Sequence, residues 1–235
     1  MAKHKIILTR SEEEGAAWGQ VLTHSGHTVN YLPVQTYAPM DPPDVHVAHF
    51  HLVLFTSKNA VTFFKAAFPH ARQYHVSCAA VGRATARAAE EAGFKVDLVA
   101  DQEKAEGLAR EIGRRYPPKA KLLLPCSSIA RDELPAALGK AGYSVTVMPL
   151  YTPVSLPPPE DLNAVLAAAT DILFFAPSQV RAFFSWITET PAHLTYWAIG
   201  ATTLKEMPPA LQARSLPQPM PGELVRLLRL AAAAE

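Results

Sequence analysis

Short apolar runs alternate with longer amphipathic stretches along this chain. The runs are rich in leucine and β-branched residues, and they predict strands at 6–9, 28–32, 52–56, 78–81, 96–99, 121–124, 144–148, 171–175 and 196–199. Between them, apolar residues at three- and four-residue spacing predict helices at 12–24, 58–67, 84–92, 105–116 and 129–141. Strands that are apolar on both faces are typical of parallel sheets covered by helices on each side. The pattern therefore predicts an α/β protein, with Gly26, Gly93 and Gly142 ending helices.

One α/β unit occurs twice in the sequence. Residues 121–149 align without a gap with residues 5–33, at a shift of 116 positions. Two later stretches also repeat. LFTSKNAVTFF (54–64) resembles LFFAPSQVRAFF (173–184) at a shift of 119 positions, and AVGRAT (80–85) resembles AIGATT (198–203) at a shift of 118. Self-similarity of this kind indicates an internal duplication.

The order of the repeated parts predicts how the domains are built. We call the two aligned stretches, 5–33 and 121–149, half-units, because each is only part of a domain. The second half-unit can complete a domain with the segment before it. The first half-unit is then left to join the C-terminal segment. We therefore expect two doubly wound, flavodoxin- or Rossmann-like domains, one formed by 1–33 with 156–235 and the other by 39–149. The crossings at 34–38 and 150–155 have similar sequences and are predicted to pair as a two-stranded hinge. The alternative is two sequential domains divided near residue 118.

Composition narrows the class of protein. The 235 residues are 18% charged and 49% hydrophobic, which suits a compact fold with a substantial core. A net charge of +1 gives no reason to expect nucleic-acid or acidic-membrane binding. Apolar runs are too short for a membrane helix, the N-terminal MAKHKIILTR lacks a signal-peptide pattern, and Cys78 and Cys126 each adjoin an apolar run. We expect a monomeric cytoplasmic protein with buried thiols.

Several common kinds of site do not fit. The first predicted turn, TRSEEE, lacks the glycines that a dinucleotide-binding turn requires, and the sequence around Ser57 is not a hydrolase elbow. The spacing of His46, His49 and His51 suits no familiar metal site, so we expect no metal.

The motifs taken together resemble one enzyme family. They are ILTR (7–10), FTSKNAV (55–61), AVGRATA (80–86), LLLPCSSIARDELPAAL (122–138), GYSVTVMPLYTPV (142–154), LFFAPSQV (173–180) and AIGATT (198–203). Each is loose alone, but their order, spacing and duplication resemble the uroporphyrinogen-III synthase family along almost the whole chain.

The resemblance implies a lyase of haem biosynthesis that closes linear hydroxymethylbilane into uroporphyrinogen III. Water is lost and ring D, the last pyrrole, is inverted, through an azafulvene cation and a spiro intermediate. The resemblance also implies two domains separated by a flexible cleft, and no cofactor. The alternatives are a non-catalytic two-lobed binding protein for an anionic small molecule, or a family member that has lost activity.

The eight carboxylates of this substrate must be met locally, because the chain has no basic cluster. Strand ends that lead into helix N-termini offer free N–H groups and a positive dipole end. Candidates at such junctions are Thr56, Ser57, Lys58, Gly82, Thr85, Ser127, Ser128, Ser178, Gly200 and Thr203. The alternative is that these residues are ordinary helix N-caps.

Three further residues fit motifs of the family, and a fourth departs from them. Tyr151 matches a tyrosine beside the hinge, whose phenol would assist departure of the hydroxyl group as a hydrogen-bond donor or general acid; otherwise it is an amphipathic hinge residue. Thr9 and Arg10 end the first predicted strand, where Arg10 would pair with a propionate or brace the domain. Ala176 stands where the family commonly has serine, so only a backbone N–H contact would survive there.

Overall fold

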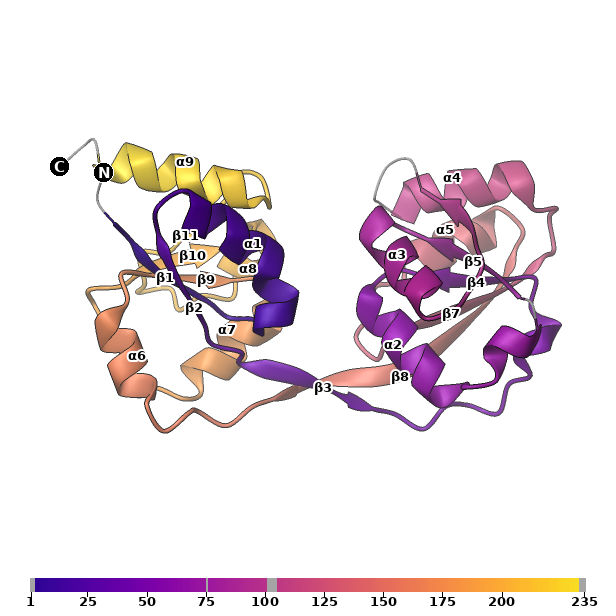
Figure 1. Ribbon diagram of the computed structural model, residues 1–235, viewed down its shortest axis with the longest axis horizontal. Helices are drawn as coiled ribbons and strands as arrows, with labels where there is room; N and C mark the ends of the chain where they lie inside the picture. The colour runs from indigo at the N-terminus through magenta and orange to yellow at the C-terminus, as the bar shows by residue number, and fades with distance from the viewer. Residues whose placement is uncertain (1–2, 75, 101–104, 233–235) are drawn as a thin grey trace. The chain divides into compact units, whose positions relative to one another are not determined.

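The computed structural model describes residues 3–74, 76–100 and 105–232, and the chain divides into two compact units. Unit 1 comprises residues 1–36 with 154–235, and unit 2 comprises residues 37–153. Each unit contains a mainly parallel sheet with helices on both faces (Figure 1). The α/β fold class expected from the sequence is confirmed. The unit boundaries fall within β3 (Gln35–Pro39) and β8 (Ser144–Ser155), which lie beside each other in the sheet order.

Unit 1 contains a five-stranded sheet in the order β11-β10-β9-β1-β2. Its strands are β1 (Lys5–Leu8), β2 (Thr28–Tyr31), β9 (Asp171–Phe174), β10 (Thr195–Ala198) and β11 (Arg214–Ser215), and every pairing is parallel. One face packs against α1 (Glu12–His24) and α9 (Pro221–Ala232). The other packs against α6 (Leu162–Ala168), α7 (Pro177–Phe184) and α8 (Ala201–Leu204). Burial of both faces explains why the strands read as continuous apolar runs.

Unit 2 has the sheet order β3-β8-β7-β4-β5-β6. Its remaining strands are β4 (Leu52–Phe55), β5 (Ser77–Ala80), β6 (Val96–Val99) and β7 (Lys121–Ser127), and the pairings among β4 to β8 are parallel. Helices α2 (Lys58–Ala67) and α3 (Arg83–Glu91) cover one face, and α4 (Ala105–Arg115) and α5 (Glu133–Lys140) cover the other. Two short 3₁₀ helices, Val47–His49 and Ala71–Tyr74, join these elements.

The two sheets share one topology. Numbered along the chain, unit 1 has the order 2-1-3-4-5, which is the flavodoxin-like order. Apart from its additional edge strand β3, unit 2 has the same order when β7 is counted first, because β7 and β8 correspond to β1 and β2 while β4 and β5 correspond to β9 and β10. The spatial arrangement thus follows the internal duplication of the sequence.

Most predicted elements occur where the pattern places them, and several details differ. Gly26, Gly93 and Gly142 have φ of 89°, 87° and 89°, so the predicted left-handed helix ends are confirmed. The helix predicted at 129–141 begins only at Glu133, because the Ser127 carbonyl accepts a turn hydrogen bond from Ala130 N–H. Strand β8 runs on to Ser155, and the two-residue β11 was not predicted. In the described part of the chain, every helix is too short or too polar to cross a lipid bilayer.

Candidate functional site

The carboxyl ends of β4, β5 and β7 meet at one edge of the unit 2 sheet, since parallel strands end on the same side. The register places Phe55 opposite Ala80, so the junctions that follow, at Ser57 and Gly82, are neighbours. On the other side of β4, Ser127 ends β7 and pairs with Tyr151 of β8. This edge therefore gathers hydroxyl groups and helix N-termini within unit 2.

Ser57 begins α2 and also contacts Tyr151. Its backbone is extended, with φ −155° and ψ 160°, and its Oγ accepts a hydrogen bond from Ala60 N–H at 3.1 Å. This is an N-cap, which satisfies one of the free N–H groups of the first turn. The same Oγ lies 3.1 Å from the phenolic oxygen of Tyr151. Ser57 therefore acts both as a helix cap and as the partner of the candidate phenol.

A β-bulge turns Tyr151 toward α2. Cys126 pairs with Pro149, but Ser127 pairs with Tyr151, so β8 gains one extra residue at this point. In a regular strand Tyr151 would lie on the face opposite Leu150. Here both residues join the core cluster under α2 and α3. Bulges of this kind re-aim side chains beside functional sites.

Two aromatic rings hold the phenol of Tyr151. Phe63 of α2 stacks on it with ring centroids 4.7 Å apart and planes 16° from parallel, while Tyr37 meets it edge-on at 5.4 Å and 89°. Tyr151 is only 5% exposed. Burial raises the pKa of the phenol above its ordinary value, and the hydrogen bond to Ser57 partly offsets that rise. The phenol is therefore protonated at neutral pH and able to donate a hydrogen bond.

The turn after β7 fixes the backbone of Tyr151. Ser128 N–H donates to the Tyr151 carbonyl at 2.8 Å, and Ser128 Oγ–H donates to Thr152 Oγ1 at 2.8 Å. Ser127 Oγ accepts from the N–H of Ile129, whose side chain is 64% exposed. Both serine hydroxyls therefore have partners inside unit 2.

The remaining candidates of unit 2 differ in exposure. Thr56 and Lys58 are exposed at the start of α2, while Thr85 is buried in the first turn of α3. Gly82 is the N-cap of α3 and has an extended backbone, with φ −149°. Because glycine has no side chain, Gly82 cannot cap the N–H groups of that first turn.

The candidates of unit 1 lie at the carboxyl edge of its own sheet. The Arg10 guanidinium lies 4.1 Å from the ring centroid of Phe175, a cation–π geometry, and Arg10 is half-buried. Thr9 is 1% exposed, with its hydroxyl 2.9 Å from the Leu173 carbonyl and 2.8 Å from Gln179 Oε1. The Thr9 side chain thus joins β1 to β9 and α7 instead of facing solvent.

The start of α7 is built differently from its counterpart in unit 2. Ala176 occupies the position of Ser57 and cannot cap the helix with a side chain. Gln179 Oε1 instead accepts from Phe175 N–H at 2.9 Å, and Ser178 Oγ–H donates to Gln35 Oε1 at 3.0 Å. Gly200 precedes the four-residue α8, in which Thr203 is buried.

Comparison with known proteins decides the family. The family model described as uroporphyrinogen-III synthase HemD matches residues 16–211, which is most of the chain. The chain belongs to the uroporphyrinogen-III synthase family. Members of this family are lyases of haem biosynthesis, and the chain is an enzyme of that type.

Relatives and solved structures agree with this membership. A curated relative from Methanothermobacter thermautotrophicus, itself assigned to uroporphyrinogen-III synthase provisionally, is 31% identical over 171 residues that span 66% of this chain and 68% of the relative. The crystal structure of uroporphyrinogen-III synthetase from Helicobacter pylori has a TM-score of 0.69 and 18% identity, covering 99% of this chain and 100% of that one. A mutant uroporphyrinogen III synthase from Thermus thermophilus has a TM-score of 0.53 and 18% identity, with the same coverage. The structural likenesses show the fold.

In this member of the synthase family, the partners of the predicted residues were missed from the sequence. Phe63 and Tyr37 flank Tyr151, yet both look like ordinary amphipathic positions. Gln35 carried a usable signal, because the shift of 116 that aligns the two half-units pairs Gln35 with Tyr151. Gln179 carried none, since a glutamine in the first turn of a helix is common.

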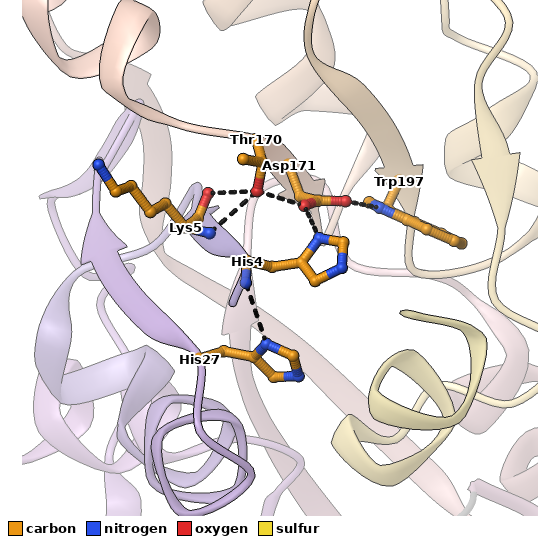
Figure 2. A network of polar contacts seen from close by, with 6 residues as sticks. All are labelled: His4, Lys5, His27, Thr170, Asp171 and Trp197. Atoms are coloured by element: carbon orange, nitrogen blue, oxygen red, sulfur yellow. Dashed lines mark hydrogen bonds and ion pairs between the residues drawn. The ribbon is translucent and has the colours of Figure 1, made fainter. Parts of the chain in front are cut away.

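A second polar network, also missed, lies at the amino ends of the unit 1 strands (Figure 2). Asp171, 1% exposed, accepts hydrogen bonds from His4 Nδ1 at 2.7 Å, Trp197 Nε1 at 2.8 Å and Thr170 Oγ1 at 2.7 Å. His27 Nδ1 accepts from His4 N–H, while its buried Nε2 has no partner among the described residues. Burial and the nearby His4 lower the pKa of His27. The network joins β1, β9 and β10 at the edge of the unit 1 sheet opposite Thr9 and Arg10, so we assign it a structural role.

Proposed function

We propose that this chain converts hydroxymethylbilane into uroporphyrinogen III, with Tyr151 assisting loss of the substrate hydroxyl. The observation that carries the proposal is the buried, protonated phenol at the carboxyl edge of unit 2, in a member of the uroporphyrinogen-III synthase family. A phenol in this state can donate its proton, which is the requirement for a general acid at neutral pH.

The proposed chemistry needs little more than a proton donor and a folded substrate. The phenol gives its proton to the hydroxyl as the carbon–oxygen bond breaks, so water leaves and an azafulvene cation remains. Ring D attacks through its substituted carbon, and the resulting spiro intermediate fragments and closes again with ring D inverted. The proton lost when the ring regains aromaticity returns to the phenolate, which balances the cycle. Holding the bilane in a folded shape supplies much of the remaining acceleration.

The carboxylates of the substrate would be met by donors at the two carboxyl edges. In unit 2 these are Thr56, Lys58, Gly82, Ser127, Ser128, the backbone N–H of Ser57 and the first-turn N–H groups of α2 and α3, with the buried Thr85 supporting the start of α3. In unit 1 they are Arg10, Ser178, Gly200 and the backbone N–H groups near Ala176, with Thr9 supporting the strand end and the buried Thr203 supporting the start of α8. Helix N-termini suit anions because their N–H groups and dipole point outward.

The proposal includes domain organisation and setting. The domains are 1–33 with 156–235, and 39–149, joined by a hinge at 34–38 and 150–155. This division is supported by the boundaries of the compact units, which fall inside the two hinge segments. The proposed setting is the cytoplasm, which is consistent with Cys78 and Cys126, both buried free thiols. The proposed oligomeric state is a monomer.

The direct test supplies freshly prepared hydroxymethylbilane to the purified protein, oxidises the product and separates the porphyrin isomers. Mainly isomer III, above the isomer I that forms without enzyme, supports the proposal. Isomer I alone with bilane still bound would indicate a binding protein or an inactive relative. Isomer I alone without bound bilane would contradict the substrate assignment.

A further inference from the structure

Two hydrogen bonds in series lead from helix α2 to the phenol of Tyr151. Ala60 N–H donates to Ser57 Oγ at 3.1 Å, and Ser57 Oγ lies 3.1 Å from Tyr151 Oη. The N–H is one of the free donors of the first helical turn, where the helix dipole is positive. Each oxygen in the series carries one proton, so the direction of the second bond decides where the phenolic proton points.

Only one direction leaves Tyr151 able to serve the reaction. If the phenol donated to Ser57, its single proton would be occupied and the phenol could not donate to the substrate hydroxyl. When Ser57 donates instead, the phenolic proton is free for the substrate. The hydrogen bond that Ser57 accepts from Ala60 favours this direction, because accepting one hydrogen bond strengthens an O–H group as a donor.

We propose that Ser57 is a positioning residue for Tyr151, which donates its hydroxyl proton to the phenolic oxygen, directs the phenolic proton to the leaving hydroxyl and stabilises the phenolate that remains. This inference rests on the proposed function and deepens it. It gives Ser57 a role through Tyr151, beyond that of a carboxylate donor or a helix cap.

Because two aromatic rings hold the ring of Tyr151, the hydrogen bond with Ser57 determines the direction of the phenolic O–H group. Stacking on Phe63 and edge contact with Tyr37 fix the plane of the Tyr151 ring, so the remaining freedom is rotation of the O–H group. Ser57 caps α2 and Phe63 lies within the same helix. Helix α2 therefore sets the proton direction and, together with Tyr37 of β3, the ring plane.

The corresponding place in unit 1 lacks this arrangement. Ala176 replaces Ser57 and Gln35 replaces Tyr151 under the shifts that align the repeats. There, Ser178 donates to Gln35 Oε1, an amide oxygen that has no proton to pass on. The relay is thus confined to unit 2, which is consistent with one proton-donating step in the reaction.

The first test is a double-mutant cycle between Ser57 and Tyr151, measured as the rate of uroporphyrinogen III formation. We expect Ser57→Ala to lower kcat by about 10-fold with KM changed by less than about 3-fold, as for loss of a hydrogen bond to a developing charge. In the Tyr151→Phe background the same change should lower kcat by less than about 2-fold. Ser57→Thr, which keeps the hydroxyl, should restore kcat to within about 3-fold of the wild type.

A second test needs no substrate. With 3-fluorotyrosine at position 151, a ¹⁹F NMR titration reports the phenol directly, and Ser57→Ala should raise its pKa because the donor to the phenolate is lost. Ser57→Gly is the matched variant, since glycine retains most of the capping preference but has no hydroxyl. It should raise the pKa equally while unfolding closer to the wild type than Ser57→Ala.

The results separate this inference from the proposed function. Equal losses of kcat from Ser57→Ala with and without the Tyr151 hydroxyl would overturn the relay, as would an unchanged phenol pKa. Either can occur while the wild type still makes isomer III. If the wild type makes only isomer I, the function fails and the catalytic role of Ser57 fails with it, even where the titration still detects the hydrogen bond.

Discussion

His4 Nδ1 lies 2.7 Å from Asp171 Oδ2, so the residue that precedes β1 is bonded to the first residue of β9. Since a carboxylate only accepts, the imidazole must carry its proton on Nδ1. The second carboxylate oxygen accepts from Trp197 on β10, which extends the connection across three strands. The stability of unit 1 should therefore depend on this carboxylate.

Asp171→Asn replaces an acceptor by an amide that must present a donor to one of these partners. We expect it to lower the free energy of unfolding by about 2–4 kcal/mol, because buried polar groups lose their partners. Urea unfolding followed by tryptophan fluorescence measures this, since Trp18, Trp186 and Trp197 all belong to unit 1. The exposed Asp161→Asn, the same change in the same unit, should cost less than about 0.5 kcal/mol. Equal effects would contradict the role of the network.

His27 should make unit 1 less stable in acid. Its pKa is lowered by burial first and by His4 next, with Asp171 opposing and Arg229 adding to the shift. The unfolded chain then binds a proton near pH 6.5 while the folded unit does not, so stability is complete above about pH 6.5 and falls as the pH drops below it. The slope from one proton is at most about 1.4 kcal/mol per pH unit. Urea unfolding between about pH 7.5 and pH 5.5 should show a smaller slope for His27→Asn, and coincident slopes would refute this.

Gly19 makes room for Tyr31. A Cβ at position 19 would lie 1.9 Å from Tyr31 Oη and 3.0 Å from Cζ, so the ring must shift. We expect Gly19→Ala to destabilise unit 1 by about 1–3 kcal/mol despite the better helix propensity of alanine. Adding Tyr31→Phe should recover part of that loss, because the closest atom is removed. Gly113→Ala in α4, where a Cβ meets no described atom within 4 Å, should be neutral or stabilising by up to about 1 kcal/mol when unfolding is followed by circular dichroism.

Tyr151→Phe should slow the formation of uroporphyrinogen III without abolishing it. We expect a loss of about 10- to 100-fold in kcat, because conformational control of the bilane survives the change. Tyr143→Phe is the matched control in the same unit, since its hydroxyl donates to the Tyr116 carbonyl at 2.8 Å and is not part of the candidate site. A Tyr151→Phe rate equal to that of Tyr143→Phe would show that the phenol takes no part, while a loss of many orders of magnitude would refute conformational control.

The sequence indicated the fold well because both faces of every central strand are buried. Apolar runs such as Leu52–Phe55 and Asp171–Phe174 are limited to the strand length, and the duplication revealed the shared topology. Polar side chains that interrupt an apolar run were harder to interpret. Asp171 lies inside an apolar run, and a hydropathy pattern does not say which donors reach it.

The candidate site was predicted as residues but not as contacts. Ser57 and Tyr151 were both expected, yet their hydrogen bond depends on the one-residue bulge opposite Ser127, which leaves no trace in the hydrophobic pattern. The contribution of Thr9 also depends on packing, because only the fold shows that its hydroxyl has internal partners. The helix start predicted at 129 was wrong because two hydrogen bonds keep this turn out of the helix, from Ala130 N–H to the Ser127 carbonyl and from Ser128 N–H to the Tyr151 carbonyl.

The placement of β1 between β9 and β2 sets an order on biosynthesis. Strand β1 is translated before unit 2, but β9, its neighbour in the sheet, emerges from the ribosome only after the whole of unit 2 has been made. At ordinary translation speeds this delay is on the order of ten seconds. Unit 2 can therefore fold while Ile6, Leu8, Trp18 and Leu22 still lack the partners that bury them. Strand β1 therefore waits for β9 until unit 2 has been made, and a chaperone that shields apolar segments has most to protect there.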